Sequence, residues 1–61
     1  MTQDRLTVPA MTAKDAQEIA RRQWERDGLR VVRFVGEPVR VSERPEWRVT
    51  AEVELIRREW T

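Results

Sequence analysis

The chain lacks both cysteine and histidine, and these two absences exclude a large part of protein chemistry. Without cysteine there is no disulfide and no thiolate metal site. Without histidine the commonest metal ligand and the usual general base are missing. Only two glycines are present, Gly28 and Gly36, too few for a glycine-rich phosphate-binding loop. No catalytic constellation is found, and we expect neither an enzyme nor a metal site.

Long hydrophobic runs are also missing. No stretch approaches the ~20 apolar residues of a membrane-spanning helix. The N-terminal segment MTQDRLTVPAMTAKD does not combine a basic start with an apolar centre, as a signal peptide does. The sequence therefore predicts a cytoplasmic protein, of a bacterial type, without a membrane partner.

Charge of one sign does not dominate either. Twelve basic residues stand beside eleven acidic ones, for a formal net charge of +1. A nucleic-acid-binding domain normally carries a strongly basic face, so this balance argues against a nucleic-acid partner. All but one of the basic residues are arginine. The planar guanidinium suits phosphate or carboxylate recognition, but the base composition of a genome explains the same bias more simply.

The length of the chain limits its core. Its 61 residues make one small domain, 1–61. A domain of this size buries only about 60% of the surface of its unfolded chain. Small domains usually add disulfides, a metal or a partner subunit. Because cysteine and histidine are missing, the sequence favours self-association as the extra source of stability.

The first residues predict a short strand after a loose start. Residues 1–4 are polar and are expected to be disordered. Apolar and polar residues alternate over 5–8, which predicts a strand that ends at Pro9.

A helix is expected over about 13–27. Thr12 and Asp15 form a capping-box pattern at its start, and Gly28 is a typical left-handed stop at its end. Its apolar stripe consists of Ala13, Ala16, Ile19, Ala20 and Trp24.

The second half of the chain is typical of a hairpin over about 29–56. Strand-forming residues make up LRVVRFV, the segment GEP interrupts them, and VRVS resumes the alternation. ERPE is the turn, and WRVTAEVELI is the last strand. The predicted fold class is therefore α+β: β-α-β-β, with one helix packed on a small antiparallel sheet that has a bent middle strand.

The alternation also predicts the face that each residue occupies. A regular middle strand would bury Arg33 beneath the helix, so one extra residue is placed at 36–38. This bulge turns Val32 and Phe34 toward the helix, with Phe34 opposite Leu55.

This placement also predicts the residues on the open face of the sheet, which the helix does not cover, and divides that face into two ends. An apolar end is predicted from Val31, Val35, Ile56 and Trp60. A polar end is predicted from Arg40, Arg48, Thr50, Glu52 and Glu54, with the glutamates paired to the two arginines. Because an exposed apolar patch on a small sheet usually marks an interface, the apolar end is the candidate interface.

The order of elements resembles that of the dodecins, small bacterial proteins with a short strand, one helix and a bent antiparallel hairpin. The resemblance covers nearly the whole chain, through the strand at 5–8, the helix at 13–27 and the segments RVVRFVGEPVRV and WRVTAEVELI. It implies a closed, hollow homo-oligomer that binds flavin between stacked aromatic residues. That family carries a Trp early in its second strand, where this chain has Val31, Val32 and Phe34, so no flavin contact is assigned to any residue.

The segment EWRVTAEVELIRR is similar to the GWRVxVEVxExxR segment of the gas vesicle accessory protein family designated O. The matching residues are Trp47, Arg48, Val49, Glu52 and Val53, and both segments end on an arginine. This second resemblance is confined to the last predicted strand and the residues that follow it.

Three functions remain open on the sequence. The first is a non-enzymatic homo-oligomeric interaction or scaffold protein, with a small ligand such as a flavin if the dodecin resemblance holds. The second is an accessory subunit that docks on a different protein. The third is a binder of nucleic acid or a phosphate ligand, which steep salt dependence would reveal. Its candidate residues are Arg40, Arg44, Arg48, Arg57 and Arg58.

Overall fold

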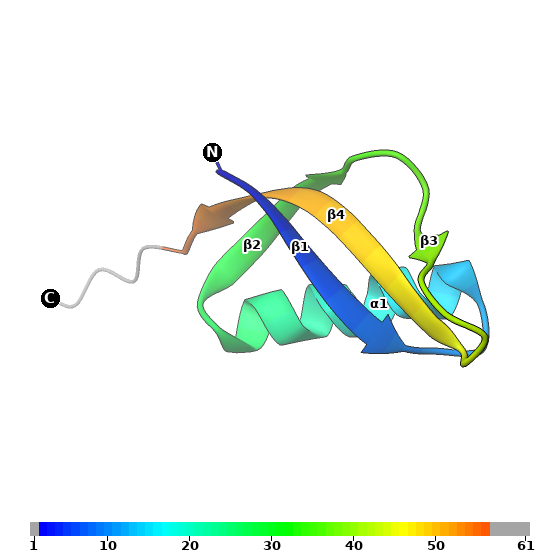
Figure 1. The fold of residues 1–61 in the computed structure, drawn as a ribbon. Helices are drawn as coiled ribbons and strands as arrows, with labels where there is room; N and C mark the ends of the chain where they lie inside the picture. Colours follow the sequence, from blue (N-terminus) through cyan, green and yellow to red (C-terminus); the bar gives the residue numbers. More distant parts are fainter. Residues whose placement is uncertain (1, 57–61) are drawn as a thin grey trace, which may run out of the picture.

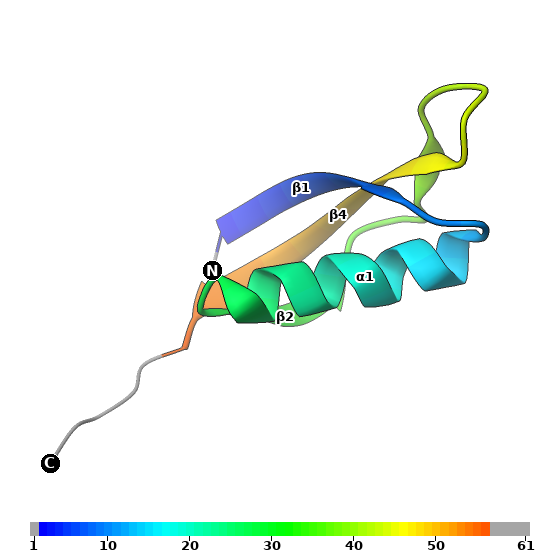
Figure 2. The ribbon, with the colours of Figure 1, turned by 90° about the horizontal axis from the view of Figure 1, so that it is seen from below.

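A computed structural model describes residues 2–56 of the chain. Its elements are β1 (Thr2–Pro9), α1 (Ala13–Arg26), β2 (Leu29–Phe34), β3 (Val39–Arg40) and β4 (Glu46–Leu55). The predicted α+β class is confirmed, because one helix packs on a small antiparallel sheet in the order β-α-β-β (Figure 1). The helix lies along one face of the sheet, and no other described element covers the opposite face (Figure 2).

The last strand, β4, is the centre of the sheet. β1 pairs with it along its whole length, from Thr2 opposite Val53 to Pro9 opposite Glu46. On the side of β4 away from β1, β2 pairs with the C-terminal part of β4 and β3 pairs with its N-terminal part. β1 therefore forms one edge of the sheet, and β2 with β3 forms the other.

The expected disorder of residues 1–4 is wrong for 2–4. These residues are the start of β1 and complete its ladder with 51–53 of β4. Their side chains are polar, but the strand gains backbone pairing and a side-chain contact with the helix. Residue 1 lies outside the described part of the chain.

The helix prediction is confirmed to within one residue. The Thr12 hydroxyl accepts the Asp15 backbone N–H at 3.1 Å, as a capping residue should. The Asp27 N–H donates to the carbonyl oxygen atoms of Gln23 and Trp24, which ends the helix. Gly28 follows with φ of 83°, a conformation that glycine adopts without strain.

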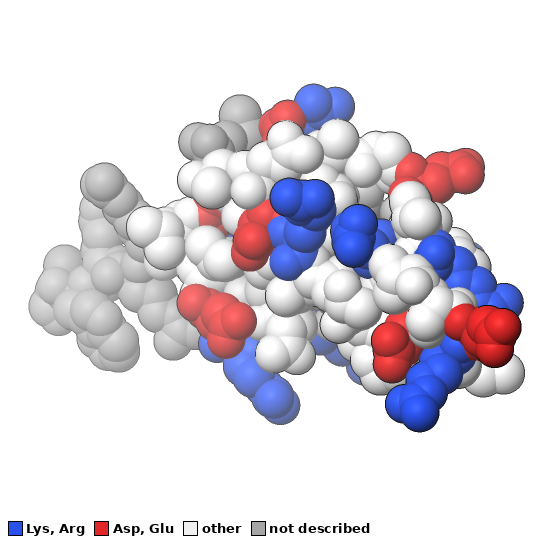
Figure 3. Space-filling model, viewed as in Figure 1, with Lys and Arg blue, Asp and Glu red and all other residues white. Residues whose placement is uncertain are grey.

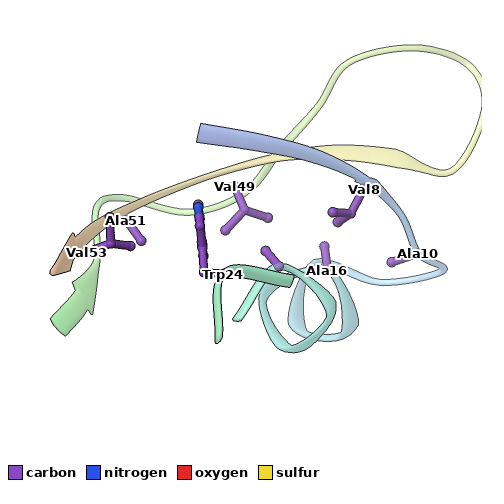
Figure 4. Packing of buried hydrophobic residues seen from close by; sticks show 8 residues of the cluster. Val8, Ala10, Ala16, Trp24, Val49, Ala51 and Val53 are labelled. Carbon is purple, nitrogen blue, oxygen red and sulfur yellow. The ribbon is translucent and has the colours of Figure 1, made fainter. Parts of the chain in front are cut away.

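The core is small and lies between α1 and the sheet (Figure 4). It consists of Val8, Ala10, Ala16, Ala20, Trp24, Val49, Ala51 and Val53. Half of these residues are alanines, which let the helix approach the sheet closely. Trp24 is 1% exposed and supplies the largest buried side chain. The helix stripe predicted from the sequence is thus confirmed in its centre, whereas Ile19 remains 38% exposed at its margin.

The bulge of the middle strand lies at Val32 and not at 36–38. Val31 is opposite Val53 and Arg33 is opposite Glu52, so Val32 is the extra residue. The predicted position of the face switch is therefore wrong by several residues.

The segment between β2 and β3 also differs from the prediction. Five steps of chain separate Phe34 from Val39, but only three separate their partners Ala51 and Arg48. Two extra residues, an even number, leave the faces unchanged.

The predicted register of Phe34 is wrong, although its face is right. Phe34 lies opposite Ala51 and not Leu55, and it packs against the core from the helix side. Val32, which was expected under the helix, is 43% exposed in the bulge.

Candidate interaction surface

The face of the sheet without a helix, called here the open face, carries mostly polar and charged residues. The register places on it Gln3, Arg5, Thr7, Arg30, Arg33, Arg48, Thr50, Glu52 and Glu54. Figure 3 views the molecule with β1 and β4 in front of the helix and shows acidic and basic side chains intermixed across this side. The predicted positions of Arg48, Glu52 and Glu54 on the open face are confirmed.

The two glutamates of β4 pair with arginines of β2. The Arg33 guanidinium donates to a Glu52 carboxylate oxygen at 2.7 Å, and Arg30 forms an ion pair with Glu54. The predicted pairing with Arg40 and Arg48 is wrong, because the true register brings different arginines opposite the glutamates.

The Arg33–Glu52 contact shifts the titration of both groups. The hydrogen bond from Arg33, with a smaller contribution from its charge, lowers the pKa of Glu52 below its ordinary value, against a partial opposing effect of desolvation. The same hydrogen bond raises the pKa of Arg33. Both effects favour the charged pair across the open face.

The predicted apolar end of the open face does not form as one patch. Val31 lies on the helix side, opposite Val53, so its assignment to the open face is wrong. Val35 donates its N–H to the Thr50 carbonyl oxygen, which places it six positions along β4 from Ile56. At about 3.3 Å per residue the two are about 20 Å apart. Trp60 lies outside the described residues.

The arginines of the phosphate hypothesis do not converge. Arg40 lies opposite Trp47, on the helix side of the sheet, so its assignment to the open face is wrong. Its guanidinium donates to the Glu43 carbonyl oxygen at 2.8 Å. Arg48 is on the open face and Arg44 is in the turn. Residues 57 and 58 are beyond the described segment.

The edge of β1 is partly closed. The Ala10 N–H donates to the Pro45 carbonyl oxygen at 2.8 Å. This bond continues the ladder of β1 with β4, and it shows that the even residues of β1 point their N–H and C=O groups toward β4. In an antiparallel ladder the direction alternates along the strand, so the odd residues of β1 turn their N–H and C=O groups outward. Of these, Pro9 has no N–H to offer.

A single carboxylate closes a second position on the same edge. Asp4 Oδ1 accepts the Arg5 backbone N–H at 2.9 Å, and Asp4 Oδ2 accepts the Trp24 indole N–H at 2.9 Å. In Figure 4 the Trp24 ring extends from the helix with its nitrogen toward the sheet. Only Gln3 and Thr7 keep an outward N–H without a partner among the described residues. Proteins commonly protect sheet edges by such means.

The edge of β2 is more open. The Ile56 N–H donates to the Gly28 carbonyl oxygen, and the Val35 N–H donates to that of Thr50. By the same alternation, Leu29, Val31 and Phe34 turn their backbone groups away from β4. In the described part of the chain, these three N–H groups have no partner.

The side chains of the same three residues are only partly buried. Leu29, Val31 and Phe34 pack against the margin of the core beneath the helix. Beside Phe34, a shallow hollow of about 180 Å³ is lined by Lys14, Gln17, Glu18 and Arg21 of the helix. The edge of β2 therefore combines free backbone groups with partly buried apolar side chains.

Trp47 also has a contact that the sequence did not indicate. Its indole N–H donates to the Ala10 carbonyl oxygen at 2.9 Å and ties the start of β4 to the segment before the helix. Like the contact between Asp4 and Trp24, it depends on a pairing register that local periodicity cannot supply.

In residues 2–56, no group of three or more acidic residues is placed to hold a metal ion. No helix of this segment is long and apolar enough to cross a membrane.

Comparison with protein-family models, curated proteins and solved structures gave no match. The resemblances to the dodecins and to the gas vesicle accessory protein family designated O therefore stay predictions.

Proposed function

We propose that this chain is a non-enzymatic accessory subunit that docks on a different protein, with the edge of β2 as its contact surface. The observation that carries the proposal is the difference between the two edges of the sheet. Asp4 and Pro9 restrict pairing along β1, whereas β2 offers free backbone groups next to partly buried apolar side chains. The cytoplasmic location expected from the sequence is part of this proposal.

Self-association is the second candidate, and a different surface favours it. Met11 is 81% exposed and Ile19 is 38% exposed, and both line a hollow at the start of the helix. Two copies could bury these side chains through their helices. The flavin ligand that the dodecin resemblance implies belongs to this alternative.

Site-specific photo-crosslinking tests the choice between a different protein and a second copy. A photo-reactive residue at Val32 is placed on β2, and a matched one at Thr7 is placed on the edge of β1; both positions are exposed. In the source cells we expect a crosslink from Val32, and not from Thr7, to a protein other than this chain. A product that joins two copies would favour the homo-oligomer instead, and no product from either position would contradict docking.

A further inference from the structure

We propose that the edge of β2 binds an extended segment in which apolar and acidic residues alternate, added to the sheet as a further strand. This inference rests on the proposed function and names the chemistry of the partner. It follows from three features of β2: its backbone groups, the side chains toward the helix, and the side chains on the open face.

The backbone of β2 provides the pairing. Leu29, Val31 and Phe34 turn N–H and C=O groups outward, away from β4. An extended peptide satisfies such groups by adding a strand, and its main chain then supplies much of the affinity. The bulge at Val32 interrupts the spacing, so the bound segment meets two short stretches of edge rather than one long one.

The helix side of β2 selects apolar residues. Leu29, Val31 and Phe34 face the helix and remain partly exposed at the margin of the core. The hollow beside Phe34 is lined by Lys14, Gln17, Glu18 and Arg21. Side chains of an added strand that point to this side would cover the three apolar residues, and burial of apolar surface is favourable.

The open-face side of β2 selects acidic residues. The side chains of Arg30 and Arg33 are 66% and 65% exposed, although each pairs with one glutamate of β4. A guanidinium has five N–H donors, so each arginine can donate to a second carboxylate. Residues of the added strand on this side lie directly beside the two arginines.

The molecule already contains one example of the expected partner. On its other side β2 pairs with β4, where Val53 and Leu55 alternate with Glu52 and Glu54. The sequence VTAEVEL of β4 is therefore a suitable probe for the free edge.

A second copy of β2 is a poor occupant of the same edge. Two β2 strands in antiparallel pairing would bring the arginines at 30 and 33 of both copies together on one face. Like charges in neighbouring cross-strand positions are destabilising. This charge pattern separates the partner proposed here from self-pairing.

The test is a titration of isotope-labelled protein with a blocked VTAEVEL peptide, followed by amide NMR shifts. We expect saturable shifts centred on Leu29, Val31 and Phe34. The charge-reversed peptide VTAKVKL should have a dissociation constant at least about tenfold higher than that of VTAEVEL. High salt should reduce this difference.

A pair of matched variants checks the site. Val31→Pro removes one outward N–H from the edge of β2, and Thr7→Pro removes one from the edge of β1; proline is tolerated at such positions. We expect V31P to lose peptide binding and T7P to keep it, with the fold of both followed by circular dichroism. If V31P does not fold, the shift map of the unaltered protein and the T7P result still decide the site.

Three results would overturn the inference: no shifts at millimolar peptide, shifts along β1, or equal binding of the acidic and basic peptides. A crosslink from Val32 to a different protein, together with any of these, would leave the proposed function standing and remove only the partner chemistry. Failure of the crosslink and of the peptide together would remove both.

Discussion

Asp4 shows how much one residue decides in a domain of this size. Its carboxylate accepts two hydrogen bonds, from the Arg5 backbone and from the Trp24 indole, and so joins β1 to the helix. From the sequence alone, Asp4 lies in the polar segment 1–4, which is expected to be disordered. The contact spans 20 positions of the chain, so no local pattern could predict it. By contrast, the core position of Trp24 could be predicted, because the helical periodicity is local.

Replacement of Asp4 by alanine should destabilise the fold. The buried Trp24 indole would lose its acceptor, and a hydrogen bond to a charged group contributes about 1.5–3 kcal/mol. We expect a loss of roughly that size in the free energy of unfolding, measured with urea. Glu37→Ala, in the exposed segment between β2 and β3, is the matched control and should change stability by less than about 0.5 kcal/mol. Equal stability of the two variants would show that the Asp4 contact contributes nothing.

The Arg33–Glu52 pair predicts a pH dependence. The hydrogen bond from Arg33 lowers the pKa of Glu52 in the folded state. A carboxyl group of this kind stabilises the fold above its unfolded pKa, and the contribution is lost as the pH falls through the lowered folded pKa. We therefore expect the free energy of unfolding to decrease on acidification through that window. Arg33→Gln should flatten the decrease, and Arg5→Gln on the same face should not; an unchanged profile in R33Q would contradict the assignment.

At the scale of elements, the sequence predicted the kinds and order of the strands and helix, but not where the bulge lies. With Val39 taken to face the helix, a regular strand would bury Arg33, so the pattern required a face switch between the two. Gly36 and Pro38 made the following loop the natural place. The structure instead places Val39 opposite Arg48, on the open face. In the structure the loop adds two residues, which preserves the faces, and the switch occurs at Val32. Valine gives no local signal of a bulge, so the pairing with β4 alone determines its position.

Deletion of Val32 tests this register. Residues 29–31 pair with 53–55 of β4, and residues 33–34 pair with the next two positions, 51–52. Without Val32, these two stretches would join into one regular ladder, and every side chain would keep its present face. We expect the shortened protein to fold with unchanged secondary structure by circular dichroism.

The matched control is deletion of Thr50 from the central strand. It moves one part of β4 to the wrong face and should prevent folding. Loss of folding on deletion of Val32, with Thr50 present, would contradict the bulge assignment.

The start of the helix offers a second prediction at this scale. Thr12→Ala removes the hydroxyl that accepts the Asp15 N–H, and loss of such a cap costs about 0.5–2 kcal/mol. We expect a lower thermal midpoint for T12A, while Thr12→Ser should restore most of the stability. Identical midpoints for T12A and the unaltered chain would show that the cap is dispensable.

For the whole molecule, elimination from the composition favours self-association, and this stays a prediction; the structure corrects only the apolar patch that was expected to support it. The predicted apolar patch is divided, since Val31 faces the helix and charged pairs separate Val35 from Ile56. One sheet edge is partly closed and the other is bordered by arginine. These features could not be predicted from the sequence, because each depends on the register between strands that are far apart in the chain.

The proposed docking on a different protein has a direct consequence for mass in solution. We expect light scattering on a sizing column to give the mass of a single chain across a wide range of concentration, with no absorbing ligand in the peak. A larger closed assembly would favour the homo-oligomer, and a yellow peak would favour the flavin-binding alternative.

The most direct test of the open edge is amide hydrogen exchange of the isolated protein at residue resolution. The amides of Arg30 and Arg33 face β4 and should exchange slowly, because ladder hydrogen bonds protect them. The amides of Leu29, Val31 and Phe34 should exchange rapidly at every protein concentration, since no residue of the segment 2–56 pairs with the edge of β2. Slow exchange at these three residues, increasing in protection with concentration, would show that a second copy covers the edge and would contradict the account.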